Sequence, residues 1–363
     1  DGALAYAACQ ENNALVVIDI AAGALLDIVA LGTKDHQRGR PELTEYVLNE
    51  VVPDWPELGT PAYDGGQAPV LLGGFSGLYY DPTQSDDNNA VFYAVPDRGP
   101  NDAAVGRASV TPATTQNLRP FKLPDYQGRF VKLTLDRATG EVTLDEEVLL
   151  TQQDGTTPIS GKGNIPGFDE VPVTYTDAAT DYTNVDFVGE DGEEYHALSY
   201  DPYGGDFEGI VRDNEGNFWM CDEYRPAIYQ FEPDGTLVER YVPEGTSLLG
   251  DTPQPAGYYG AETLPAVYRK RRANRGFEAI AYNPDTDVVY AFIQTPLYNP
   301  DNSTRNNSDV IRILGISAAD GAPVEEYVYL LERNRDSGVG LSRVDKIGDA
   351  VYTGNGRFLV LER

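Results

Sequence analysis

A repeat of short apolar runs, separated by turns rich in Asp, Asn and Gly, limits the possible fold of this chain more than any other feature. Its clearest copy consists of FEGIVRD (207–213), FWMCDE (218–223), AIYQFEP (227–233) and TLVERYV (236–242). Runs of this length, rich in aromatic and β-branched residues, are typical of strands. Four strands in about 36 residues is the length of one blade of a β-propeller. The repeat therefore predicts antiparallel meanders.

Other copies of the repeat follow the same order. FSGLYYD (75–81) and FEAIAYN (277–283) match the first run, and VFYAVPD (91–97) and VVYAFIQ (288–294) match the second. Third and fourth strands are expected at 129–136, 141–150, 310–317 and 325–331. Partial copies lie at both ends of the chain, at 4–10, 14–20, 24–31 and 349–363.

We therefore predict an all-β fold, a single β-propeller domain over residues 1–363 with about five to seven four-stranded blades. Residues 1–32 form a partial N-terminal blade. Because the last copy stops after its second strand, we expect the chain to be truncated at its C-terminus. Long inserts separate the blades, at 33–72, 98–128, 151–205 and 243–276. Inserts of this length often carry binding loops.

The chain is strongly acidic, with 27 Lys and Arg against 58 Asp and Glu and a net charge of −31. A surface of this charge repels polyanions, so we expect no nucleic-acid partner. No apolar run approaches the length of a membrane span, so we expect no membrane insertion. Cys9 and Cys221 lie far apart, which fits neither a disulfide framework nor a paired metal site. The acids either solvate a surface in saline or extracellular water or gather to bind hard cations.

Some polar residues recur at matching positions of the repeat. When the second strands are aligned by an aromatic residue, a polar residue follows four positions later, at Gln10, Asp97, Glu223, Gln294 and Glu362. In the first strands, Ser76, Glu208 and Glu278 each follow a Phe. Equivalent positions of propeller blades surround the central axis, so we expect these side chains to ring one mouth of the channel.

This ring predicts a cation site. Close carboxylates raise one another's pKa or recruit a cation, and ligand sets made of oxygen favour Ca²⁺ over Zn²⁺. The candidate ligands are Asp97, Glu208, Asp222, Glu223, Glu278 and Glu362. The alternative is that each acid is an exposed residue at the end of its strand.

Arginines follow several of these acids. Arg98 comes directly after Asp97, Arg225 lies two positions after Glu223, and Arg275 ends the basic run RKRRANR (269–275). The guanidinium group suits phosphate and carboxylate ligands. The alternative for the basic run is a solvated loop that balances local acid. Other catalytic patterns are weak, because the chain has 2 histidines and Ser76 lacks the GxSxG elbow.

Four separated motifs resemble, in order, those of the phytase-like propeller family, also called "esterase-like activity of phytase". They are GGFSGLYYDP with FYAVPDRGPN, DFEGIVRDNEGNFWMCDEYRPAIYQFEPDG, RGFEAIAYNPDTDVVYA and RFLVLER, over residues 73–363. The N-terminal segment AYAACQENNALVVIDIAAGALLDIVALGTKDH is similar to choice-of-anchor-type secreted surface proteins. The resemblance implies a secreted, extracellular, cell-surface or periplasmic propeller, with functional acids at Asp97, Glu208, Glu223, Glu278 and Glu362.

The leading hypothesis is a Ca²⁺-assisted hydrolase of a small phosphorylated substrate, either a phosphomonoester or a phosphodiester. Glu223 is expected as the general base, with Glu278, Arg98, Arg225 and Arg275 as further catalytic candidates. The alternative is a non-enzymatic, calcium-binding extracellular propeller that recognises another protein or associates with itself. A lactonase or esterase on a Ca²⁺-centred propeller is a third hypothesis.

Overall fold

The computed structural model describes residues 4–9, 14–19, 22, 24–30, 48–61, 68–108, 116–178, 180–331 and 346–362. The chain divides into two compact units, residues 1–47 and 48–363, and each is described by itself. In the first unit, β1 (Leu4–Cys9), β2 (Ala14–Asp19) and β3 (Ala24–Ala30) form an antiparallel sheet in chain order. The predicted N-terminal strands are confirmed, whereas their role as part of a propeller blade stays a prediction.

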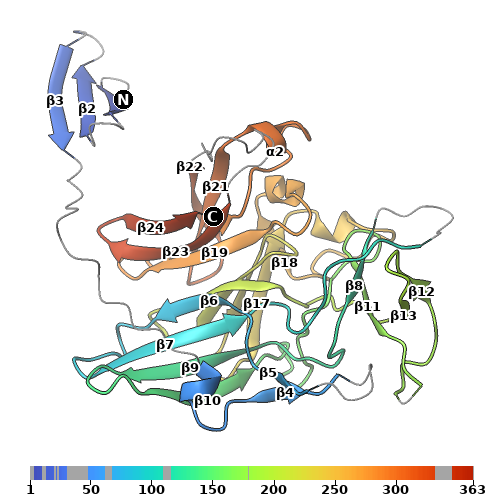
Figure 1. The fold of residues 1–363 in the computed structure, drawn as a ribbon. Helices are drawn as coiled ribbons and strands as arrows, with labels where there is room; N and C mark the ends of the chain where they lie inside the picture. The colour runs from blue at the N-terminus through green and yellow to red at the C-terminus, as the bar shows by residue number, and fades with distance from the viewer. Residues whose placement is uncertain are drawn as a thin grey trace. The chain divides into compact units, whose positions relative to one another are not determined.

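The second unit contains three antiparallel meanders whose strands lie in sequence order (Figure 1). The first meander consists of β6 (Phe75–Tyr80), β7 (Asn89–Pro96), β9 (Arg129–Asp136) and β10 (Val142–Leu149). The second consists of β14 (Phe207–Arg212), β15 (Phe218–Asp222), β16 (Ala227–Phe231) and β17 (Leu237–Pro243), with β18 (Ala261–Leu264) added parallel to β17. The third consists of β19 (Phe277–Asn283), β20 (Val288–Ile293), β21 (Val310–Ser317) and β22 (Pro323–Leu330).

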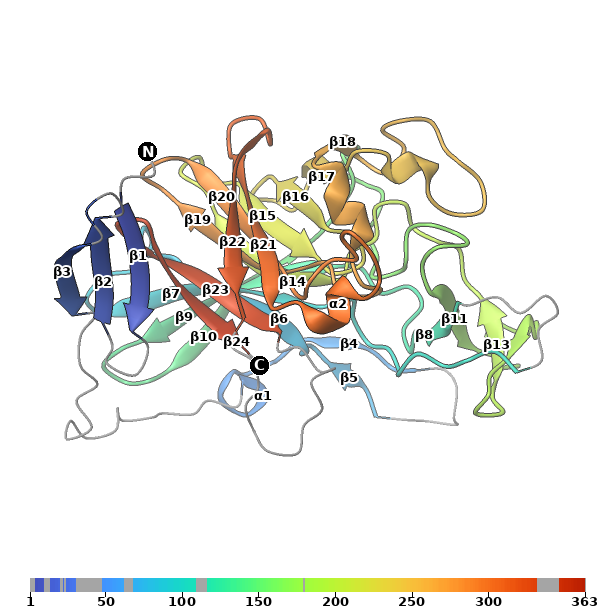
Figure 2. The same cartoon turned by 90° about the horizontal axis from the view of Figure 1, so that it is seen from above.

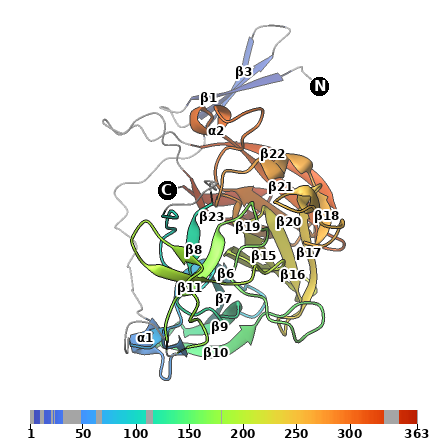
Figure 3. The ribbon, with the colours of Figure 1, turned by 90° about the vertical axis from the view of Figure 1, so that its right-hand side faces the viewer.

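A two-stranded sheet follows these meanders, formed by β23 (Ile347–Gly354) and β24 (Arg357–Glu362). The predicted first and second strands of the last repeat are therefore present. Figures 2 and 3 show the third meander, β19–β22, beside the second, β14–β17. The number of blades stays a prediction.

The inserts contain elements that the repeat did not predict. A separate sheet has the order β12 (Phe187–Val188), β13 (Glu194–Ala197), β11 (Val171–Tyr175) and β8 (Leu118–Pro120), with β8 parallel to β11. A small sheet pairs β4 (Glu57–Gly59) with β5 (Val70–Leu71). The helices are short: α1 (Leu48–Val51), α2 (Thr304–Asn307) and the 3₁₀ turns Thr246–Leu248 and Ala266–Lys270. No helix of the described residues is long and apolar enough to cross a membrane.

The first strands of successive meanders pack against one another: β6 against β14, β14 against β19, and β19 against β23. Small residues permit this approach. A Cβ atom added to Gly77 would lie 2.6 Å from the Cα atom of Gly209, and one added to Gly209 would lie 2.9 Å from a methyl group of Ile280. Apolar residues from neighbouring meanders then form continuous cores, one around Trp219, Phe277 and Phe292. Meanders whose first strands pack side by side are the arrangement of a β-propeller, and the predicted all-β propeller class is confirmed.

Candidate functional site: a buried acidic cluster

A β-bulge interrupts the same position of each first strand. The register shifts between Phe75 and Gly77, Phe207 and Gly209, Phe277 and Ala279, and Ile347 and Asp349. The extra residues are therefore Ser76, Glu208, Glu278 and Gly348. A bulge leaves its extra residue out of the hydrogen-bonded ladder and redirects its side chain. The repeat predicted that Ser76, Glu208 and Glu278 are equivalent, and the bulge supplies the structural reason.

The second strands place their polar residues at the same end. Phe75 pairs with Pro96, Phe207 with Asp222, and Phe277 with Ile293. The residues that follow these partners are Asp97, Glu223 and Gln294, which are therefore structurally equivalent, as the repeat predicted. Gln10 lies outside the described residues.

Glu362 has a different place from the one that the aromatic alignment predicted. In β24 the aromatic residue Phe358 pairs with Tyr352, and Glu362 pairs with Ile347. This pairing makes Glu362 equivalent to Asp222 rather than to Glu223. The aromatic residue lies one position further from the bulge than its counterpart Tyr290, which explains the one-residue shift. Glu362 accepts a hydrogen bond from the hydroxyl group of Tyr329 at 2.5 Å.

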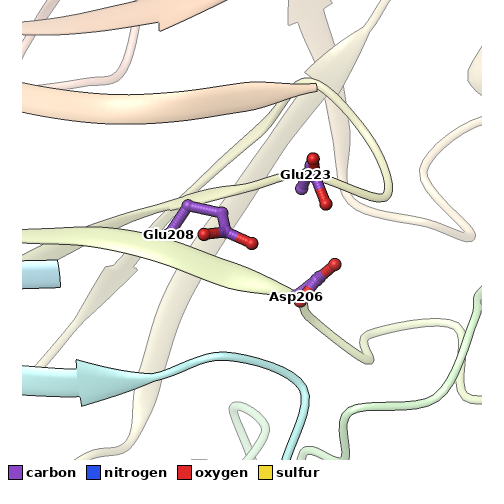
Figure 4. Close-up of side chains that lie close together, drawn as sticks. All are labelled: Asp206, Glu208 and Glu223. Carbon is purple, nitrogen blue, oxygen red and sulfur yellow. The ribbon is translucent and has the colours of Figure 1, made fainter. Parts of the chain in front are cut away.

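Three carboxylates meet beside the bulge of β14. Asp206, Glu208 and Glu223 each offer an oxygen atom within 4.8 Å of those of the other two (Figure 4). Asp206 is fully buried and Glu223 is 4% exposed. We call these three residues, together with Glu278, the acidic cluster. Asp206 was not among the predicted residues, because it precedes the first strand and has no acidic counterpart before Phe75 or Phe277.

Gln294 joins the two sides of the acidic cluster. Its Nε2 atom donates a hydrogen bond to Glu223 Oε1 at 2.8 Å and another to Glu278 Oε2. Its Oε1 atom is buried and has no hydrogen-bond partner within the parts of the chain that the structure describes. A buried amide oxygen without a partner is costly. This oxygen is therefore available to a ligand beside the carboxylates.

Burial and mutual repulsion oppose ionisation of these acids. Burial, followed by the neighbouring carboxylates, raises the pKa of Glu208 well above its ordinary value. Burial and the charge of Asp206 raise the pKa of Glu223 to about 8, and the same two causes raise that of Asp97 to about 6. The acidic cluster therefore needs either protons or a cation near neutral pH.

Arg98 compensates part of this charge. Its side chain is buried and forms an ion pair with Asp206, while its Nη2 atom lies 3.4 Å from Glu223 Oε2. Its guanidinium group lies over the ring of Tyr224, 4.8 Å from the centroid. The backbone N–H of Arg98 also donates to Asp206 Oδ1 at 3.2 Å. Arg98 therefore holds Asp206 in place and neutralises it.

The other predicted arginines have different surroundings. Arg275 Nη1 lies 2.9 Å from Glu223 Oε1, and 26% of its side chain is exposed. Arg225 is buried, forms its ion pair with Asp169 and lies over the ring of Phe168, 4.6 Å from the centroid. The structure therefore brings Arg98 and Arg275 to the acidic cluster and directs Arg225 to Asp169.

Asp97 and Asp222 lie at the edge of the acidic cluster, and both accept hydrogen bonds from backbone N–H groups. Asp97 Oδ1 accepts a hydrogen bond from the N–H of Gly99 at 3.0 Å. Asp222 Oδ1 accepts bonds from the N–H groups of Asp206 at 3.0 Å and Tyr224 at 2.8 Å, and its Oδ2 lies 3.3 Å from Arg240. Burial raises the pKa of Asp222 to about 6. Asp222 therefore fixes the backbone that carries Asp206 and the residue after Glu223.

Comparison with known proteins agrees with the motifs. The sequence profile of the phytase-like family, described as "Esterase-like activity of phytase", matches residues 70–363. This chain belongs to the phytase-like family. The profile of the choice-of-anchor I domain matches residues 1–45.

The phytase-like chain also has similar proteins among curated sequences and solved structures. An "Uncharacterized secreted protein" of Arthroderma benhamiae is 29% identical over 214 residues, which are 53% of this chain and 38% of that protein. The chain thus spans about two fifths of that relative's length. A putative 6-phosphogluconolactonase from Bacteroides uniformis is 13% identical with a TM-score of 0.27, covering 99% of this chain and 81% of that one. An aldose sugar dehydrogenase from Streptomyces coelicolor is 11% identical with a TM-score of 0.30, and the match covers 98% of this chain and 84% of that one. The fold assignment rests on the strand pairing.

The donor set of this phytase-like site fits a hard cation. Carboxylate and amide oxygens are the ligands that Ca²⁺ prefers. Asp206, Glu208 and Glu223 supply close carboxylate oxygens, and the Oε1 atom of Gln294 lies without a partner in the same environment. A divalent cation would offset the repulsion that raises the pKa of Glu208 and Glu223.

Proposed function

We propose that this protein is a secreted, Ca²⁺-assisted hydrolase of a small phosphorylated molecule, either a phosphomonoester or a phosphodiester. The observation that carries the proposal is the acidic cluster, whose buried carboxylates lie in contact with Arg98 and Arg275. Membership of the phytase-like family supports hydrolysis. The secreted relative and the choice-of-anchor I segment support an extracellular location.

Asp206, Glu208 and Glu223 would hold the ion, with Glu278 and the amide oxygen of Gln294 beside them. Bound Ca²⁺ would supply charge that offsets the negative charge of the phosphoester. Glu223 acts as the general base, since it can accept a proton from an attacking water. Gln294 and Arg275 orient it, because both contact its Oε1 atom.

The three arginines have different roles in this proposal. Arg275 is partly exposed and contacts Glu223, so it can stabilise the charge that develops on the substrate. Arg98 is buried and paired with Asp206, so it positions the carboxylate ligands. Arg225 is paired with Asp169 and positions that carboxylate instead.

Turnover assays test this function. We expect release of p-nitrophenol from p-nitrophenyl phosphate or bis(p-nitrophenyl) phosphate with Ca²⁺ present, and loss of that activity in EDTA. Glu223→Gln should lower kcat at least about 100-fold, because loss of a general base typically costs that much. Glu215→Gln, an exposed turn residue of the same meander, is the matched control. Equal turnover by wild type and Glu223→Gln would refute the proposed mechanism.

A second candidate function is a non-enzymatic extracellular propeller that uses Ca²⁺ structurally. The near-complete burial of Asp206 and Glu223 favours it, because closed cation sites usually stabilise a fold. This function predicts calcium binding without hydrolysis of either phosphoester. Turnover of phenyl acetate, and of a lactone, measured under the same conditions, tests the esterase and lactonase hypotheses.

A further inference from the structure

A cavity of about 570 Å³ opens next to Arg98, between the 167–170 segment and the loop 269–274. Arg98 links the cavity to the acidic cluster. Asn274 and Tyr224 line the cavity, and Arg98 donates to Asn274 Oδ1 at 3.0 Å and lies over the Tyr224 ring. Glu170, also in the wall, has its Oε2 atom 3.8 Å from Arg98 Nη1. Arg98 therefore contacts both the acidic cluster and residues of the cavity wall.

The two carboxylates in the cavity wall are already neutralised. Asp169 forms ion pairs with Arg225 and Arg271, the second at 3.4 Å. Glu170 accepts two hydrogen bonds from Arg119, at 2.7 and 3.0 Å. Each acid is therefore engaged by more than one arginine, counting the contact of Glu170 with Arg98.

Two further cations line the cavity and have neutral partners. Lys270 Nζ donates to the amide oxygen of Asn299 at 3.2 Å, and Arg269 Nη1 donates to the carbonyl of Gly245 at 3.2 Å. Arg269 Nε is buried without a hydrogen-bond partner in the described parts of the chain. In a chain of net charge −31, this wall therefore has an excess of positive charge. Such a wall raises the local concentration of small anions.

We propose that this cavity binds the oxyanion group of a small ligand, with Lys270 and Arg269 as its principal contacts. Its volume lies within the range of small-molecule pockets. Arg and Lys donors favour phosphate and carboxylate oxygens, and the bond strengthens where the site excludes water. The proposal goes beyond the hydrolytic function, because this binding needs neither a bound cation nor turnover.

Calorimetric titration with inorganic phosphate, and separately with citrate, tests this proposal on the full chain in EDTA at low salt. We expect saturable binding of at least one of these anions, weakened at least about tenfold by Lys270→Ala and by Arg269→Ala, since a hydrogen bond to a charged group contributes on the order of 1.4 kcal/mol or more. Which anion binds identifies the class as phosphate or carboxylate. Lys132→Ala, on β9, is the control and should bind as wild type does.

Glu208→Gln separates this proposal from the proposed function. This variant should retain anion binding even if it loses hydrolysis, because Glu208 does not line the cavity. Thermal melts of each variant show whether it is folded. Absence of binding by both anions, or unchanged affinity in folded Lys270→Ala and Arg269→Ala, would overturn the proposal.

Discussion

Asp206 is the residue that most changes the interpretation of the site. It supplies the third carboxylate of the close group and is the acid that Arg98 neutralises. Its position before the first strand has no acidic counterpart in the other meanders, so the repeat gave no reason to select it. Its place in the acidic cluster depends on the insert that leads into β14, and the path of an insert cannot be read from strand periodicity.

Removal of Arg98 should destabilise the protein strongly. Arg98→Ala leaves Asp206 buried without its compensating charge, and loss of one partner of a buried ion pair costs about 3–5 kcal/mol. Urea unfolding in EDTA measures the change, with Arg137→Ala, on an exposed turn, as the control. A free energy of unfolding within 1 kcal/mol of wild type, on the order of a surface change, would contradict the assigned role of Arg98.

Calcium affinity should fall when the acidic cluster loses a charged oxygen. We expect Asp206→Asn and Glu208→Gln each to weaken Ca²⁺ binding at least about tenfold, because the number of charged ligands tunes calcium affinity. Calorimetric titration of Ca²⁺ into metal-free protein makes the comparison, and Glu215→Gln should match wild type. Unchanged affinity in both variants would place the calcium elsewhere.

At the scale of elements, the bulged first strand is the unit that builds the site. Phe207 and Phe277 anchor their strands in the core, the bulge redirects the extra residue, and the small residue after it lets neighbouring first strands approach. The pattern Phe-Ser/Glu-Gly/Ala therefore determines both the packing of the first strands and the position of the bulged polar residue. The equivalence of Ser76, Glu208 and Glu278 could be predicted from this pattern alone.

The close approach of β6 and β14 gives a stability prediction. Gly77→Ala places a Cβ atom 2.6 Å from the Cα atom of Gly209, a contact that needs a backbone shift. We expect a loss of about 1–3 kcal/mol, as for other overpacked cores. Gly73→Ala, whose nearest new contact is 3.9 Å away, is the control. Thermal unfolding measures the difference, and equal melting temperatures for the two variants would contradict this account of strand packing.

The sequence predicted the strands of the meanders well, because most are short runs rich in aromatic and β-branched residues that are bounded by turns. It was less informative where register depends on a single residue, as for Glu362, whose strand has its aromatic residue one position further out. The sheet of β8, β11, β12 and β13 could not be predicted, because its strands are two to five residues long and pair across the chain. The inserts fix the partners of Arg98 and Arg225, so these contacts also required the structure.

At the scale of the whole molecule, the net charge is −31, but two regions have a charge distribution that differs from this average. Few acids of the described residues are buried, and the acidic cluster gathers several of them in one site. Beside it, the cavity between 167–170 and 269–274 has excess positive charge. Under the two proposals, this contrast would place a cation site and a small-anion site next to each other in a strongly acidic protein.

The buried acids predict an unusual pH dependence. Folded-state pKa values of about 8 for Glu223 and about 6 for Asp97 and Asp222 exceed those of unfolded carboxyls, so the folded protein binds more protons between about pH 4 and 8. Their contribution to stability is therefore complete below about pH 4 and is lost as pH rises toward 8. In EDTA, the melting temperature should fall from pH 5.5 to 8.5, and Ca²⁺ should restore it most at pH 8.5. A calcium effect that is equal at both pH values would contradict this linkage.

The proposed function depends on a calcium ion bound by Asp206, Glu208 and Glu223. Crystals grown with Ca²⁺, with anomalous data collected at a wavelength where calcium scatters, would show whether the ion binds there. We predict an anomalous peak with ligand distances of about 2.3–2.6 Å to oxygens of these three carboxylates. Anomalous peaks confined to other parts of the molecule, with the acidic cluster closed by hydrogen bonds between its own carboxyl groups, would contradict the account.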